Sequence, residues 1–102
     1  MKLWEERRMK KAILDLTNCK SYMEMHRRFK KDLIFPDFYG ENWDAFWDSL
    51  MYESPLNYVE VRGEHTVGEE LAPMLEKLHE MLERVKQMRR KYGLEFDYVI
   101  VD

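Results

Sequence analysis

The sequence has one cysteine, four scattered glycines and no long apolar run. One cysteine cannot form an internal disulfide, so we expect a reducing, cytoplasmic location and interpret Cys19 as an inert loop thiol, not a catalytic one. No apolar stretch approaches the ~18 residues that span a bilayer, which predicts no membrane contact. The net charge of −3 lacks the basic bias of nucleic-acid-binding domains, so no nucleic acid partner is expected.

Signatures of catalytic and cofactor sites are also missing. None of the glycines opens a phosphate-binding loop after a strand, and no serine has the flanking glycines of a nucleophile elbow. The cysteine and the histidines have no metal-ligand spacing. We therefore predict no cofactor, no metal and no enzymatic activity. Asp44 and Asp48 leave two alternatives open, a hard-cation site or an acid and base pair, but no third group converges on them.

What the sequence does contain is an alternation of short apolar runs with helical patterns. Apolar runs of strand length occur at 11–16, 58–62 and 96–102. The first and last are interpreted as strands buried on both faces, and the alternating middle run as an edge strand. Strands separated by helices need crossover connections, which predicts the α/β class: a small three-stranded parallel sheet packed with three to four helices. We expect one domain, 9–102, after an N-terminal extension, 1–8.

Capping residues and apolar stripes mark the helices. Ser21 and Glu24 form a capping box, after which Tyr22, Met25, Phe29 and Leu33 recur at helical steps. His26 beside that stripe is interpreted as a hydrogen-bonded structural histidine. Gly40 allows a tight or left-handed turn, and Asn42 caps a second helix over about 43–51. A methionine-rich stripe from Leu71 to Tyr92 predicts a long core-packing helix that ends at Gly93.

One segment, FPDFYGENWDAFWDSL at 35–50, combines aromatic and acidic residues around a single glycine. On the second helix its apolar residues form a stripe of ordinary width: Trp43, Phe46, Trp47 and Leu50. Asp44 and Asp48 lie four residues apart, where like charges repel. Two interpretations follow, a solvated acidic face or a recognition surface for arginine or lysine of a partner. Spacing alone favours the solvated face.

This segment resembles the central motif of the barstar family, small intracellular inhibitors of secreted bacterial ribonucleases. MKKAILDL at 9–16 is similar to the opening strand of the family, and DYVIV at 97–101 is similar to its last strand. The resemblance therefore extends from about residue 9 to the end. It implies a barstar-like fold and, as partner, a barnase-like ribonuclease with a basic active site.

The resemblance also implies a role for each residue of the motif. Asp48 would be the principal anchor, placed where substrate phosphate would sit, and Asp44 would bind a second donor nearby. The other implied contacts are the loop residues Tyr39, Gly40 and Asn42, the flanking Trp43 and Trp47, and Phe38, which stands where the family has a contacting tyrosine. QMRRKYG at 87–93 is basic where the family has an acidic contact. This favours the alternative of an immunity or interaction module for a different toxin or regulatory partner.

Overall fold

The computed structural model describes residues 10–102, so the predicted N-terminal extension, 1–8, lies outside the described residues. Three strands, β1 (Lys11–Asp15), β2 (Tyr58–Arg62) and β3 (Asp97–Ile100), form one parallel sheet in the order β1-β2-β3. Each parallel step is made through a helical crossover, which confirms the predicted α/β class. No helix in the described range is long and apolar enough to cross a membrane.

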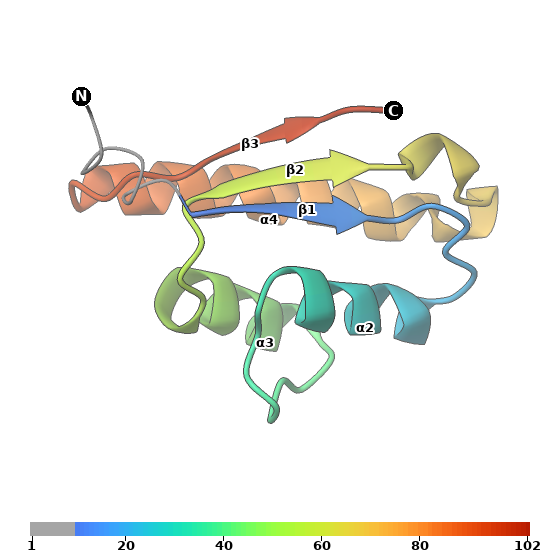
Figure 1. Cartoon of the computed structure of the whole chain (residues 1–102), viewed down its shortest axis with the longest axis horizontal. Helices are drawn as coiled ribbons and strands as arrows, with labels where there is room; N and C mark the ends of the chain where they lie inside the picture. The colour runs from blue at the N-terminus through green and yellow to red at the C-terminus, as the bar shows by residue number, and fades with distance from the viewer. Residues whose placement is uncertain (1–9) are drawn as a thin grey trace.

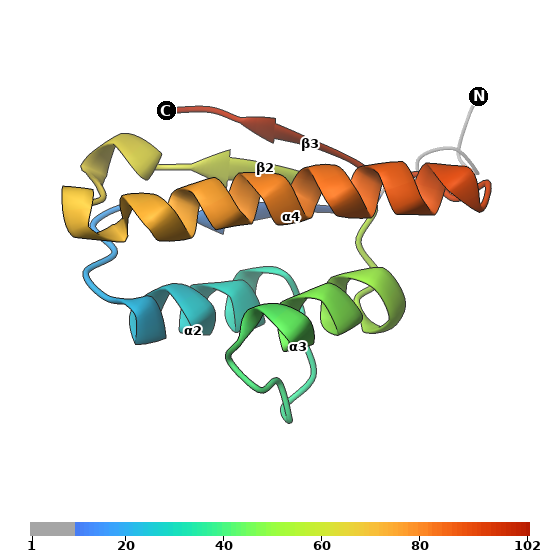
Figure 2. The ribbon, with the colours of Figure 1, turned by 180° about the vertical axis from the view of Figure 1, so that it is seen from behind.

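The three α-helices of this range are α2 (Tyr22–Asp32), α3 (Trp43–Asp48) and α4 (Ala72–Lys91). In Figure 1, α4 runs behind the sheet, α2 and α3 lie below its β1 edge, and the near face carries no helix among residues 10–102. Figure 2 shows α3 below the long α4. A core of buried aromatic and aliphatic side chains fills the space between the helices and the covered face, with Phe29, Phe46, Leu14, Val59, Leu78, Leu82 and Phe96 among its largest members.

The middle strand is central, so its prediction as an edge strand is wrong. β2 pairs with β1 on one side and with β3 on the other. Its alternation arises because the helices cover one face: Val59 and Val61 point into the core, and Glu60 faces the other way. Glu60 is nevertheless only 8% exposed. Lys11 lies 3.1 Å from its carboxylate, and Arg62 is a second basic partner.

The outer strands are not buried on both faces, which corrects the second strand prediction. In β1, Leu14 is buried while Ile13 is 43% exposed. No residue of β3 is buried, and the strand is shorter than the predicted run 96–102, although its parallel pairing agrees with the prediction. The apolar runs at 11–16 and 96–102 therefore mark strands at the two edges of a sheet with one covered face.

The predicted helix signals are largely confirmed. The Ser21 hydroxyl accepts from the Glu24 amide at 3.1 Å, and the Glu24 carboxylate accepts from the Lys20 amide at 2.6 Å, one residue before the expected partner. Most residues of the two stripes are buried, but Leu75 and Met88 are half-buried, and Tyr22 and Tyr92 are exposed. α4 ends at Lys91, and Gly93 follows with a left-handed φ of 75°.

Candidate partner-binding site

The segment predicted to contact a partner begins where α2 ends. Leu33 caps the helix, and Ile34 then adopts a left-handed backbone with a φ of 56°. The Phe35 amide donates to the Lys30 carbonyl at 3.0 Å and completes the C-terminal turn. The Lys30 ammonium donates to the Asp37 carbonyl at 3.0 Å. These bonds hold the first half of the loop against α2.

Tyr39 anchors the middle of the loop from inside. Its side chain is 6% exposed, and its hydroxyl lies 2.7 Å from Nδ1 of His26. The His26 ring also contacts Phe29 and Trp43, with centroids 5.2 and 5.5 Å apart. Burial lowers the pKa of His26 and raises the pKa of Tyr39, and the Glu41 carboxylate raises both to a smaller extent. His26 is thus the hydrogen-bonded structural histidine that was predicted.

Asn42 fixes the point where the loop enters α3. Its Oδ1 accepts from the Ala45 amide at 2.8 Å, which confirms the predicted cap, and its Nδ2 donates to the Gly40 carbonyl at 3.1 Å. Of the tight or left-handed turn predicted at Gly40, the left-handed alternative is wrong, because Glu41 is the left-handed residue, with a φ of 52°. At Gly40, an added Cβ would lie 3.3 Å from Nδ2 of Asn42. The glycine therefore gives the capping side chain room to fold back.

α3 divides its side chains between the core and the surface. Phe46 is fully buried, Trp43 and Trp47 are half-buried, and Asp44 and Asp48 are exposed. The α-helix ends at Asp48, earlier than predicted, and a π-helical turn, Ser49–Glu53, continues it. The aromatic stripe thus anchors α3 and leaves both aspartates at the surface.

An open cleft of about 360 Å³ lies between the exposed side of α3 and α4. It is lined by Trp43, Asp44, Trp47 and Asp48 from α3 and by Lys77, Met81 and Arg84 from α4. The Arg84 guanidinium lies over the Trp47 ring, 5.4 Å from its centroid. The cleft therefore brings acidic and aromatic groups of α3 together with basic groups of α4.

The two aspartates have no basic partner in the described part of the chain. Neither side chain forms a hydrogen bond or an ion pair with any residue of 10–102. Their spacing of four residues on one helix makes them repel each other. The dipole of α3 favours a negative charge at Asp44, near the N-terminus, but not at Asp48, the last residue of the helix. The fold leaves an unfavourable charge pair facing solvent.

Phe38 projects from the loop before α3. At 76% exposure it is the most exposed large hydrophobic side chain among residues 10–102. Exposed aromatic side chains are common anchors of protein interfaces. The loop and α3 together therefore present one exposed aromatic residue, two half-buried tryptophans and two unpaired carboxylates.

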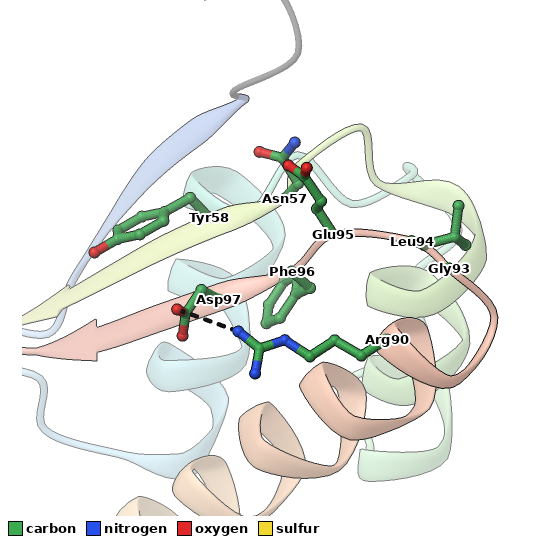
Figure 3. Close-up of a pocket in the computed structure, with 8 residues that line it drawn as sticks. All are labelled: Asn57, Tyr58, Arg90, Gly93, Leu94, Glu95, Phe96 and Asp97. Carbon is green, nitrogen blue, oxygen red and sulfur yellow. Dashed lines mark ion pairs between the residues drawn. The ribbon is translucent and has the colours of Figure 1, made fainter. Parts of the chain in front are cut away.

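A larger hollow of about 510 Å³ lies at the C-terminal end of α4, where β2 and β3 begin (Figure 3). Arg90 points into it and pairs with Asp97 at 3.6 Å. Lys86 approaches the same carboxylate at 3.2 Å. Because the charged groups at its centre already pair with each other, this hollow is a weaker candidate than the cleft beside α3. No group of three potential metal ligands occurs among residues 10–102.

Comparison with known proteins identifies the family. The family model described as "Barstar (barnase inhibitor)" matches residues 9–101. The chain belongs to the barstar family. A relative from Bacillus subtilis (strain 168), named "Putative ribonuclease inhibitor YrdF", is 34% identical over 83 residues, which cover 76% of this chain and 91% of the relative. The resemblance inferred from the motif is confirmed, and a barstar-like ribonuclease inhibitor is the function that these matches support.

The barstar-family motif occupies both core and surface in this chain. The predicted contacts Trp43, Asp44, Trp47 and Asp48 meet in one cleft, and Phe38 lies exposed on the preceding loop. The other three are placed differently: Tyr39 is buried, the side chain of Asn42 is used for capping, and Gly40 has no side chain. These three shape the loop, so any contact that they make with a partner would involve main-chain atoms for the most part.

Sequence reasoning missed the basic wall of the cleft. Lys77 and Arg84 lie more than thirty residues after the motif and reach the site only because α4 packs beside α3. A signal was present: Lys77, Arg84 and Lys91 recur every seven residues, which places them on one side of a helix. That pattern predicts a basic stripe but not the helix that lies opposite.

Proposed function

We propose that this barstar-family chain is a cytoplasmic inhibitor of a barnase-like ribonuclease and that its α3 surface covers the basic active site. The observation that carries the proposal is the pair of exposed, unpaired carboxylates, Asp44 and Asp48, beside two half-buried tryptophans. Arginine binds carboxylates and phosphates with the same fork geometry. A carboxylate in the place of a substrate phosphate would therefore block RNA from entering.

Each part of the surface has a distinct task in this proposal. Asp48 is the principal anchor for the basic groups of the nuclease, and Asp44 binds a second donor nearby. Phe38 and the main chain of Gly40 and Asn42 contact the rim of the active site. Inhibition is by occlusion, so the chain itself catalyses nothing.

The surface is also well prepared for tight binding. The Asn42 cap fixes the start of α3, and the hydrogen bond between His26 and Tyr39 fixes the loop. Groups that are rigid before association lose less conformational entropy when they bind. The nuclease would also relieve the repulsion between the aspartates, which no ion pair within residues 10–102 relieves.

The experiment is a titration of RNA cleavage by barnase and other secreted bacterial ribonucleases with the purified chain. We expect stoichiometric inhibition of at least one of them, and faster association at low salt, because exposed charges steer encounter. Asp48→Ala should weaken that inhibition by a factor corresponding to about 2–5 kcal/mol, the range for truncating one partner of a buried charge pair.

The matched control is Glu76→Ala, which removes the same charge from an exposed position of α4 outside the cleft. It should inhibit like the unchanged chain. If every ribonuclease tested keeps its full activity at a molar excess of the chain, the proposal is wrong. Unchanged inhibition by Asp48→Ala would show that another surface is used.

A second candidate function uses the same surface on a different partner, as an immunity or regulatory module. The basic wall formed by Lys77 and Arg84 favours it, since it would repel a nuclease that is basic throughout. A complex with a toxin that is not a ribonuclease, lost in Asp48→Ala, would support this candidate. Stoichiometric ribonuclease inhibition would exclude it as the principal role.

A further inference from the structure

The cleft beside α3 continues along α4 into a second hollow. This hollow, of about 280 Å³, is lined by Trp47, Glu83, Arg84, Gln87, Met88 and Lys91. It shares Trp47 and Arg84 with the cleft that holds Asp44 and Asp48. The two hollows therefore form one groove, in which the Trp47 ring and the Arg84 guanidinium stacked on it mark the middle.

Basic residues of α4 follow this groove from Lys77 to Lys91. Lys77, Arg84 and Lys91 are spaced by seven residues and line one or the other hollow. Their charges are only partly balanced by neighbouring carboxylates in the described chain. Lys77 and Arg84 both approach one carboxylate, Glu80, at 3.5 and 3.9 Å, and Lys91 forms no ion pair within residues 10–102. With Glu83 as the second carboxylate on this side, α4 presents three basic groups against two acidic ones, a small surplus of positive charge.

A partner that covers Asp48 must also cover part of this basic wall. Asp48 and Arg84 line the same cleft, and a stable protein interface buries about 800 Å² on each partner, far more than one helix face. Charges inside such a footprint lose hydration, and like charges that face them repel and weaken the complex. Arg84 and Lys77 therefore influence the affinity of any complex in which the aspartates are bound.

We propose that Lys77 and Arg84 determine the specificity of the inhibitor by selecting a ribonuclease that carries acidic side chains next to its basic active site. The partner is thus bipolar, with basic groups facing Asp44 and Asp48 and carboxylates facing α4. A nuclease that is basic at both places is discriminated against. This inference rests on the proposed function, because it concerns the same surface.

The test measures inhibition of barnase, used as the basic probe, by chains with reversed charges on α4. Lys77→Glu and Arg84→Glu should each strengthen inhibition at low salt by roughly tenfold, which corresponds to about 1.4 kcal/mol. The gain should shrink as salt is raised, because screening weakens interactions between charges that solvent still reaches. Lys77→Glu is the cleaner variant, since Arg84→Glu also removes the stacking on Trp47.

The matched control is Lys20→Glu, which makes the same charge change at an exposed position in the loop before α2. It should change inhibition of barnase by less than twofold. If Lys77→Glu and Arg84→Glu behave like Lys20→Glu while Asp48→Ala still weakens inhibition, the specificity inference fails and the proposed function stands.

Weaker inhibition by both reversed chains, or no inhibition of barnase by any chain, also overturns the specificity inference. In the second case the titration of the wider ribonuclease set decides separately whether the proposed function holds. Urea unfolding of every variant shows whether a loss of inhibition reflects a loss of folding.

Discussion

The acidic residues of the sheet and those of α3 differ in whether the fold gives them basic partners. Glu60 on β2 is paired with Lys11 and Arg62, and Asp97 on β3 is paired with Lys86 and Arg90. Asp44 and Asp48 on α3 have no partner in the described chain and face each other at a repulsive spacing. The paired acids belong to the architecture of the sheet, whereas the unpaired acids form a surface that a basic partner would stabilise.

The pKa values of the paired acids follow from these contacts. Hydrogen bonds from Lys11 and then Arg62 lower the pKa of Glu60. The pKa of Asp97 is lowered mainly by the amide of Tyr98, with Lys86 as a further contributor. A lowered carboxyl pKa means that the ionised form stabilises the folded chain. Each set of acids can therefore be tested by a different measurement, stability for the sheet and inhibition for α3.

The largest expected effect is on inhibition, and it distinguishes the acids of α3 from the acids of the sheet. The double change Asp44→Ala, Asp48→Ala should abolish inhibition of the target ribonuclease, by more than about 10³-fold if each carboxylate contributes at least ~2 kcal/mol. Its free energy of unfolding should stay within about 0.5 kcal/mol of the unchanged chain, because these are exposed positions. Urea unfolding and inhibition titrations on the same samples check both halves. A large loss of stability would show that the α3 acids are structural after all.

The reverse pattern is expected on the sheet. Glu60→Gln removes the charge that Lys11 and Arg62 share, so it should lower the free energy of unfolding. It should leave inhibition of the ribonuclease unchanged when the concentration of folded inhibitor is saturating. Among carboxylates paired in the structure, Glu60 should be the most sensitive, because it is the buried one. The exposed Glu76→Gln is the control and should change neither property. Impaired inhibition by a fully folded Glu60→Gln chain would break the comparison.

Stability should fall in two ranges as the pH is lowered. The pKa of His26 lies below its ordinary value of 6.5 because of burial, so below about pH 6.5 the unfolded chain binds a proton that the folded chain does not. Stability therefore declines from about pH 6.5 down to the folded pKa. The contribution of Glu60 and Asp97, whose pKa values are lowered, is complete above the ordinary carboxyl pKa and is lost at more acidic pH.

The measurement for this prediction is urea unfolding from pH 8 to pH 3. His26→Gln should make the free energy of unfolding depend less on pH in the range just below about pH 6.5. It should keep the decline of the free energy of unfolding in the acidic range, where carboxylates are protonated. If His26→Gln shows the same pH dependence of stability in the upper range as the unchanged chain, a group other than His26 causes that dependence. Tyr39 and Glu41, which face His26 from the loop, do not change this expectation, since their influence on the pKa of His26 is smaller than that of burial or absent.

The smallest expected effect is on the free energy of unfolding and comes from a substitution that involves no charge. Ile34 is 55% exposed and holds a left-handed φ of 56°. That conformation costs a non-glycine residue roughly 1–2 kcal/mol, against about 0.5–1 kcal/mol of extra chain entropy for glycine. Ile34→Gly should therefore raise the free energy of unfolding by about 0.5–1 kcal/mol. Asn18→Gly, at a φ of 59°, should gain less, because asparagine tolerates this conformation better.

Much of the fold followed from local patterns. Caps at Ser21 and Asn42 and the stop at Gly93 act through neighbouring backbone groups, so short-range reasoning located the helices well. The order and burial of the strands did not follow, because apolar composition does not say which face of a sheet is covered. Glu60 illustrates this point: its polar character suggested an edge, but Lys11 from the neighbouring strand makes its burial in the centre tolerable.

The amino-acid sequence was enough to establish the barstar-family motif, the helix that carries Asp44 and Asp48, and the repulsion between these two aspartates, since all three depend on residues close together in the chain. Tertiary packing alone placed Tyr39 in the core against His26 and set Lys77 and Arg84 opposite the aspartates. The physical reason is distance along the chain. Contacts between separate helices depend on how the core packs, and no local spacing encodes them.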